Sequence, residues 1–182
     1  LTLSHENQDG YLAKVMPPIR AQSDVVSVWS AIGKNQINTI GTDHVANQLK
    51  LKLGGDDVWD ALAGFPGIGT SLPILLSEGV NKQRINLNQL VNLTSSNASK
   101  IFGLKSKGYL DIGFDADITV IDLKKEVKVS PSLFGGFSDY LVYDGWNLKG
   151  WPVKTIVRGN LVAEDFKVIG KPGFGKFISR SS

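Results

Sequence analysis

The sequence predicts an α/β chain whose first part is mainly helical, with a short strand, and whose second part is rich in strands. Apolar residues recur at helical spacing up to about residue 105. Beyond that point apolar and polar residues alternate with a period of two, which is typical of strands. We therefore place a boundary near "LKSKG", between residues 1–105 and a β-rich region, 106–165.

The first predicted element is a helix in "SDVVSVWSAIG", with Ser23 as its N-cap and Gly33 as its stop. Its apolar residues at helical spacing are Val25, Val28, Trp29 and Ile32. The next stretch, "QINTIGTD", is rich in β-branched residues and predicts a strand that ends near Thr42. A helix that runs into a short strand is typical of a parallel sheet, so we expect residues 36–42 to belong to one.

Loops and further helices follow. "LAGFPGIGT" contains three glycines and a proline and predicts a loop with special backbone geometry. "TSLPILLSEG" predicts a helix with Pro73 near its first turn, where a missing N–H is tolerated. "NLNQLVNLTSSNASKIFG" predicts two short helices, capped by Asn86 and Ser96 and closed by Gly103.

The second part of the chain predicts strands. "ADITVIDL" alternates, with Ile118 and Val120 on one face and Thr119 and Ile121 on the other. "VKTIVRGNLVAED" predicts a hairpin that turns at 158–160, and Gly145, Gly150 and Gly159 are interpreted as turn glycines. Residues 166–182 are expected to form an extended C-terminal tail.

Composition excludes several classes of protein. The 182 residues are 42% hydrophobic and carry a net charge of +3, without a dense Lys/Arg tract, so we expect no nucleic-acid partner. The apolar runs are far shorter than the roughly 18 to 20 residues of a membrane span, so no membrane partner is expected. The absence of cysteine excludes disulfides and thiolate ligands and fits a reducing compartment, so we expect a cytoplasmic protein.

An acid followed directly by a histidine, in "NTIGTDHVAN", carries the strongest chemical signal. By one interpretation Asp43 or Thr42 caps a following helix. By the other, Asp43 is a carboxylate at the C-terminal end of a parallel strand, where α/β barrels place their catalytic groups. The spacing alone does not decide between them. The second histidine, His5, lies in a polar stretch and is expected to be solvated.

Five segments occur in the order and at the distances found in one family. They are "LAKVMPPIR", "IGTDHVAN", "FPGIGTSLPILLSEGVNKQRINLNQLVNLTSSNASKIFG", "GYLDIGFDADITVIDL" and "GWNLKGWPVKTIVRGNLVAED". Together they resemble the C-terminal part of the cyclic amidohydrolases, the group of dihydropyrimidinase (D-hydantoinase), allantoinase and dihydroorotase. The resemblance implies the C-terminal portion of a metal-dependent (β/α)8 hydrolase barrel over 1–105, followed by the C-terminal strands of a β-sandwich.

The resemblance also implies roles for particular residues. Asp43 matches the aspartate that binds a metal and takes the proton of the attacking hydroxide during hydrolysis of a cyclic amide or imide. Met16 and the loop at Ala63 or Gly64 match positions where backbone atoms hold the substrate. Asn47, where dihydroorotases carry a histidine, is assigned to substrate binding. We interpret His44 as a hydrogen-bonded structural histidine and not as a metal ligand.

The two-metal site of this family needs more ligands than the chain offers. It uses two divalent ions, with zinc as the expected metal, held by a His-x-His, a carboxylated lysine, two further histidines and the aspartate. Only the aspartate is found here, so we expect the chain to be a fragment, a processed product or one half of an enzyme. The missing N-terminal part would be upstream sequence or a companion chain, and the complete protein a homo-oligomer. The alternative is a non-catalytic scaffold relative of the same fold.

Overall fold

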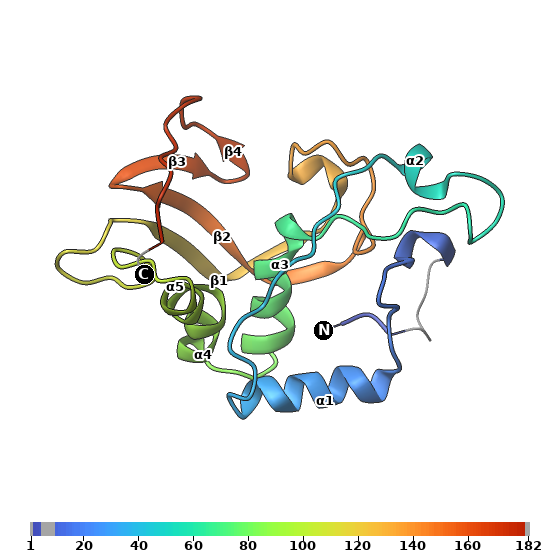
Figure 1. Cartoon of the computed structure of the whole chain (residues 1–182), viewed down its shortest axis with the longest axis horizontal. Coiled ribbons are helices and arrows are strands. Elements are labelled where there is room, and N and C mark those ends of the chain that lie inside the picture. Colours follow the sequence, from blue (N-terminus) through green and yellow to red (C-terminus); the bar gives the residue numbers. More distant parts are fainter. Residues whose placement is uncertain (1, 5–9, 181–182) are drawn as a thin grey trace.

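The computed structural model describes residues 2–4 and 10–180 and has a mixed α/β fold. Figure 1 shows the sheet at the upper left, α1 along the bottom, and the long loops that carry α2 at the right. The helical elements are η2 (Gly10–Ala13), α1 (Gln22–Gly33), α2 (Leu49–Leu53), α3 (Ile68–Ile74), η3 (Leu75–Val80), α4 (Leu87–Val91), η4 (Asn92–Ser96), α5 (Asn97–Ile101) and η5 (Pro131–Leu133). The strands are β1 (Ile118–Lys128), β2 (Asn147–Val157), β3 (Asn160–Glu164) and β4 (Lys167–Val168).

Helix α1 ends at the predicted glycine but begins one residue before the predicted cap. Ser23 lies inside the first turn, so its prediction as the N-cap is wrong. The cap position is Ala21, whose N–H donates to a carboxylate oxygen of Asp24 at 3.2 Å. An acid at this position satisfies a free backbone donor and favours the positive end of the helix dipole. The side chains that α1 buries are Val25, Trp29 and Ile32.

The segment after α1 does not form the predicted parallel strand. Residues 36–48 have no regular secondary structure, and the sheet of the described residues is antiparallel throughout. A strand requires a neighbour to pair with its N–H and C=O groups, and no described segment pairs with residues 36–42 in that way. Ile37 and Ile40 nevertheless pack against the helical core. The prediction of a parallel strand at residues 36–42 is therefore wrong for the described residues.

Helix α3 and the π-helical η3 form one continuous helix. It begins at Ile68, so Pro73 lies in its interior and not near its first turn as predicted. Proline removes one i→i−4 hydrogen bond, and the helix continues with the wider π geometry from Leu75. Gly150 lies inside β2, so its prediction as a turn glycine is wrong. A Cβ at this position would be 2.8 Å from the Cβ of Leu76. The glycine thus lets η3 approach the sheet closely.

The next two predicted helices are one. Asn86 caps α4 as predicted, because its side-chain oxygen accepts from the N–H of Gln89 at 2.9 Å. In turn, the side-chain oxygen of Gln89 accepts from the N–H of Asn86 at 3.0 Å. Ser96 has helical backbone angles within the run from α4 to α5, so its prediction as a cap is wrong. Its hydroxyl donates instead to the carbonyl of Gly108. The run ends just before Gly103, as predicted.

The sheet has the order β1-β2-β3-β4, and every pair is antiparallel. The strict alternation predicted for β1 fails, because Ile118 and Ile121 are both partly buried and Val120 is exposed. The register between β1 and β2 also shifts here: Val120 pairs with Lys154 and Ile121 with Pro152, so Val153 of β2 has no partner in β1. The hairpin between β2 and β3 turns at Arg158 and Gly159, as predicted.

The expected C-terminal tail begins within the sheet. Lys167 and Val168 form β4, and the N–H groups of Ile169 and Gly170 both donate to the carbonyl of Val162. The guanidinium of Arg158 lies 4.3 Å from the centroid of the Phe174 ring. The first part of residues 166–182 is therefore attached to the hairpin and is not a free extension.

Two apolar clusters stabilise the molecule. The first joins α1, η3 and α4 and consists of Val25, Trp29, Ile32, Leu75, Leu76, Ile85, Leu90 and Leu93. The second lies between α3 and the sheet and consists of Ile74, Val129, Leu141, Tyr143, Leu148 and Trp151. Among the described residues no helix has the length and apolar character that a membrane crossing requires.

Candidate functional site

Asp43 lies in the irregular segment between α1 and α2. Its side chain is exposed, and its backbone has a φ of +45°. Aspartate is among the few non-glycine residues that adopt this left-handed conformation readily. The conformation turns the chain sharply between Thr42 and His44, and the carboxylate is open to a ligand.

His44 fixes this segment to the start of α3. Its Nδ1 accepts hydrogen bonds from the N–H groups of Gly67, at 3.0 Å, and Ile68, at 3.3 Å. These groups belong to the free donors at a helix N-terminus, which need an external acceptor. The structural interpretation of His44 agrees with these bonds. One residue on, the N–H of Val45 donates to the carbonyl of Phe65 at 3.3 Å, so two consecutive residues hold the same loop.

The two backbone segments assigned to the substrate lie against each other. The Gly64 N–H donates to the carbonyl of Lys14, two residues before Met16, at 3.0 Å. Met16 is 67% exposed, and Ala63 is exposed as well. Gly64 is buried with a φ of +93°, and a Cβ there would be 2.4 Å from Cγ2 of Val45. Only glycine fits this position, which brings the loop against the segment that carries Asp43.

Asn47 is placed differently from the other predicted residues. It is buried, and its Oδ1 accepts from the hydroxyl of Tyr140 at 2.5 Å. Burial, and then the charge of Asp139, raise the pKa of Tyr140 to about 12, so the hydroxyl keeps its proton. The Nδ2 of Asn47 is buried and has no hydrogen-bond partner among the described residues. The burial of Asn47 sets it apart from the exposed Asp43, Met16 and Ala63.

Two lysines that the sequence did not single out organise the loop. Lys52 is fully buried, and its Nζ donates to the carbonyls of Lys14, Leu62 and Gly64. Lys14 donates to carbonyls of the loop at Val58, Trp59 and Ala61. In "LKLKL", residues 49–53, Lys50 and Lys52 would both be expected on a solvated face, because lysine is rarely buried. The sequence contains no signal that separates Lys52 from its exposed neighbour Lys50.

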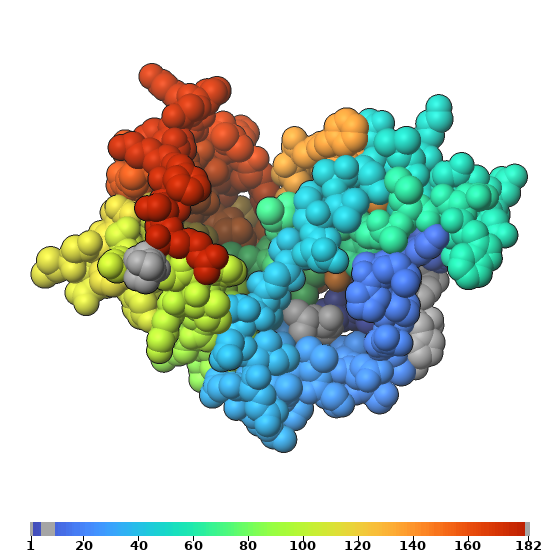
Figure 2. Space-filling model, viewed as in Figure 1, coloured from blue at the N-terminus to red at the C-terminus, as the bar shows by residue number. Residues whose placement is uncertain are grey.

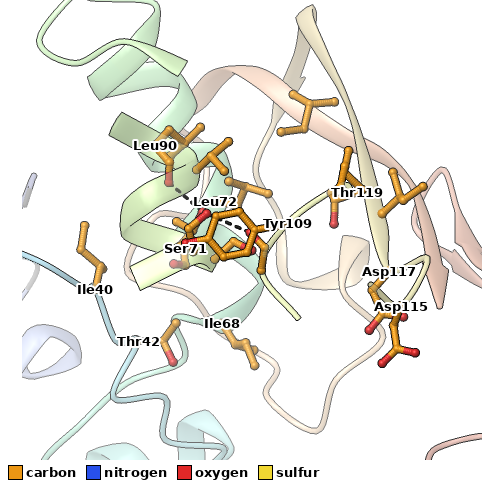
Figure 3. Close-up of a pocket in the computed structure, with 18 residues that line it drawn as sticks. Ile40, Thr42, Ile68, Ser71, Leu72, Leu90, Tyr109, Asp115, Asp117 and Thr119 are labelled. Carbon is orange, nitrogen blue, oxygen red and sulfur yellow. Dashed lines mark hydrogen bonds between the residues drawn. The ribbon is translucent and has the colours of Figure 1, made fainter. Parts of the chain in front are cut away.

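A separate hollow lies away from these residues. It has a volume of about 690 Å³ and lies between the helices and β1. Figure 3 shows Leu90 above Thr42 and Ile68, Tyr109 in the middle of the view, and Asp115 with Asp117 at the right. In the space-filling view the molecule is recessed between the red C-terminal segment and the light-blue residues around position 40 (Figure 2). Thr42 is the only lining residue next to a predicted site residue, so the hollow is not the candidate site.

A carboxylate pair with a lysine borders this hollow and has a structural role. Lys107 Nζ lies 3.0 Å from a carboxylate oxygen of Asp115 and also bonds Asp117, whose other oxygen accepts the N–H of Arg158 at 2.8 Å. Burial lowers the pKa of Lys107, but the hydrogen bonds that its ammonium group donates to Asp117 and Asp115 outweigh burial and raise the pKa above its usual value. These residues therefore connect the start of β1 to the turn of the β2–β3 hairpin.

The described residues do not by themselves fit a two-metal site. Over residues 2–4 and 10–180 there is no group of three or more His, Cys, Asp or Glu side chains that could hold a metal ion. Asp43 has the exposure and the carboxylate oxygens of one ligand. A binuclear site would need its other ligands from outside these residues.

Comparison with known sequences identifies the family. The sequence profile of the Amidohydrolase family matches residues 15–162, which is most of the chain. The chain belongs to the Amidohydrolase family. The match confirms the resemblance inferred from the five segments, and it includes every residue of the candidate site.

Individual amidohydrolases are similar over nearly the whole chain. An L-hydantoinase from Paenarthrobacter aurescens is 38% identical over 99% of this chain and 40% of its own length. A dihydroorotase from Pyrococcus furiosus is 37% identical over 93% of this chain and 38% of its own length. The chain thus spans about two-fifths of the length of these curated relatives.

Solved structures of amidohydrolases have the same fold over the shared region. D-Hydantoinase from Bacillus sp. AR9 superimposes with a TM-score of 0.92 and 32% identity, over 100% of this chain and 41% of that chain. L-Hydantoinase from Arthrobacter aurescens gives a TM-score of 0.90 and 39% identity, over 94% of this chain and 38% of that chain.

Proposed function

We propose that this amidohydrolase chain is part of an enzyme that hydrolyses a ring C–N bond of a cyclic amide or imide of the hydantoin, dihydropyrimidine, allantoin or dihydroorotate type. The observation that supports it is the convergence of three segments. The exposed carboxylate of Asp43, the backbone at Met16 and the loop at Ala63 and Gly64 are held together by backbone bonds and His44. The names of the relatives, hydantoinase and dihydroorotase, agree with this chemistry.

The proposed reaction gives each part of the site a task. Backbone groups of Met16 and Ala63 hydrogen-bond the N–H and C=O edges of the ring, and Gly64, whose own N–H and C=O bind Lys14 and Lys52, holds the loop in place. Water attacks the ring carbonyl carbon, and the Asp43 carboxylate takes the proton that the water loses. The C–N bond then breaks, and Asp43 returns that proton to the ring nitrogen. The product has a new carboxylate and an opened ring.

We also propose that the complete enzyme depends on divalent metal ions, with zinc as the expected metal. When bound, such ions lower the pKa of water and polarise the carbonyl. Asp43 would supply one ligand, and the others would come from parts of the protein outside this chain, as upstream sequence or a companion chain. The share of the relatives that the chain covers, about two-fifths, supports this division.

The same comparison supports an architecture. We propose that residues 1–105 are the last units of a (β/α)8 barrel, that 106–165 contribute strands to a β-sandwich, and that 166–182 form the C-terminal extension. The unpaired segment 36–42 would gain its strand neighbours in the complete barrel. Exposed apolar side chains near the C-terminus, such as Phe177 at 95%, support a homo-oligomer. The lack of cysteine fits a cytoplasmic location.

The test is hydrolysis by the complete protein. Purified protein is supplied with zinc and incubated with hydantoin, dihydrouracil, allantoin and dihydroorotate, and the ring-opened acid is measured. We expect turnover of at least one substrate, loss after chelation, and recovery when metal is returned. A complete protein that binds no metal and opens none of these rings would instead be a scaffold relative, and the proposal would be wrong.

A further inference from the structure

Lys52 is a buried lysine whose ammonium group binds backbone carbonyls. Its side chain is fully buried, and its Nζ lies 2.7 Å from the carbonyl of Lys14, 2.6 Å from that of Leu62 and 2.7 Å from that of Gly64. None of the ion pairs between described residues includes it. An ammonium group has three N–H donors, and here each one has a backbone acceptor.

The three acceptors come from the two segments that the proposed function assigns to the substrate. The carbonyl of Lys14 lies two residues before Met16, and those of Leu62 and Gly64 flank Ala63. Two further bonds close the arrangement: the Leu62 N–H donates to the carbonyl of Lys52 at 2.9 Å, and the Gly64 N–H donates to that of Lys14. Lys52 therefore lies where both segments meet.

A second lysine holds the outer part of the same loop. Lys14 Nζ donates to the carbonyls of Val58 and Ala61 at 2.7 and 2.5 Å. Burial, and then the charge of Lys14, lower the pKa of Lys52 to about 8. The positive charges of Lys14 and Lys52 repel each other. The dipoles of the carbonyls that Lys52 binds offset this repulsion. The three donors of Lys52 fix the spacing of the three carbonyls that they bind.

We propose that Lys52 is a positioning residue: by binding the carbonyls of Lys14, Leu62 and Gly64 to one ammonium group, it sets the distance between the Met16 segment and the Ala63 loop and so aligns the backbone groups that hold the cyclic amide ring. This rests on the proposed function, because it assigns a role within that site. Lys52 does not touch the substrate itself. Lys52 acts by positioning the backbone groups that bind the ring, so its loss should weaken substrate binding.

The experiment compares Lys52→Met with Lys50→Met in the complete, metal-loaded protein. Methionine keeps an unbranched apolar side chain that is one atom shorter and removes the donors, and Lys50 is an exposed lysine on the same helix. KM and kcat are measured for hydantoin and dihydrouracil well below the unfolding temperature of each variant. We expect Lys52→Met to raise KM roughly tenfold or more while kcat changes less, because misplaced binding groups weaken ring binding. Lys50→Met should match the wild type.

Lys52→Arg covers the case in which the methionine variant does not fold. Arginine keeps the charge, but its planar, longer group cannot place donors on the three carbonyls at the same spacing, so KM should rise here too. A wild-type KM in either folded variant would overturn the proposal and leave Lys52 with a purely structural role.

Amide hydrogen exchange separates this inference from the proposed function. The N–H groups of Leu62 and Gly64 should exchange faster in Lys52→Met than in Lys50→Met, whether or not any substrate is hydrolysed. If the wild type opens no cyclic amide, the proposed function fails. Faster exchange at these two amides would still support the proposal that Lys52 holds the two segments together. Unchanged exchange at both amides would overturn the proposal that Lys52 holds the two segments together.

Discussion

The segments that carry the candidate site and the segments that form the sheet differ in what holds them together. Residues 36–48 and 54–67 have almost no regular structure before α3, and polar side chains bind their backbone: Lys14, His44 and Lys52. The sheet is held by strand ladders and a buried apolar cluster around Trp151. A site built on irregular backbone thus depends on a few polar groups, whereas the sheet depends on packing.

Because packing holds the sheet together, we expect the largest loss of stability from a substitution in the apolar cluster at the sheet. Trp151 is fully buried, stacks on Phe134 with ring centroids 6.3 Å apart, and donates from Nε1 to the carbonyl of Leu148 at 2.9 Å. Trp151→Ala should lower the free energy of unfolding by about 3–5 kcal/mol. Urea unfolding followed by far-UV circular dichroism measures it.

The matched control is Trp59→Ala, on the site-side loop, where the indole is 83% exposed. Its effect should stay within about 0.5 kcal/mol. Equal losses in the two variants would mean that packing stabilises both regions alike, and the comparison would fail.

A second prediction concerns the contact between the two regions. Tyr140→Phe removes the hydrogen bond from the Tyr140 hydroxyl to the buried Oδ1 of Asn47 and should cost about 1–3 kcal/mol. The double variant Tyr140→Phe with Asn47→Leu should recover part of this loss, because no polar group is then left buried without a partner. Thermal unfolding of the single and double variants measures the coupling. Tyr109→Phe, at a half-exposed tyrosine, is the control, and an equal loss there would contradict the assignment.

The smallest expected effect is electrostatic and depends on pH. Burial raises the pKa of Asp117, but hydrogen bonds from Lys107 and the Arg158 N–H outweigh it and hold the pKa below its usual value of 3.8. The charged form therefore stabilises the fold above pH 3.8, and this contribution disappears as the pH falls through the lower folded-state pKa. Asp117→Asn should cost about 1 kcal/mol at pH 7, because the side chain is only partly buried.

Unfolding of the wild type and of Asp117→Asn is compared between pH 7 and the acid limit of folding. The difference should shrink as the acid is protonated. A difference that stays constant across this range would show that the charge of Asp117 has no part in joining β1 to the hairpin.

Local signals in the sequence predicted elements whose cause is local. Asn86 and Gln89 make a capping box within four residues, and Arg158-Gly159 form a tight turn by themselves, so both were found. The register shift at Val120 and the burial of Lys52 depend on partners far along the chain. A period or a propensity cannot report such partners. The strand predicted at 36–42 failed for the same reason, since pairing requires a neighbour.

The candidate site was predictable to a similar extent. The resemblance selected Asp43, Met16, Ala63 and Gly64, and the structure brings their segments together. The structure places Asn47 in a buried contact with Tyr140, and no pattern in the sequence near position 47 indicates this contact. The lysines that bind the loop carbonyls were missed because exposed and buried lysines look alike in sequence.

The measurement that tests the central claim most directly is the turnover of Asp43→Asn in the complete, metal-loaded protein. Asparagine tolerates the positive φ of this position as well as aspartate does, so the backbone should be kept while the proton acceptor is lost. With hydantoin or the best cyclic substrate, kcat should fall roughly 100- to 10,000-fold, with unfolding unchanged. Asp56→Asn, an exposed acid in the neighbouring loop, should keep wild-type turnover. Near-normal turnover by Asp43→Asn would contradict the account.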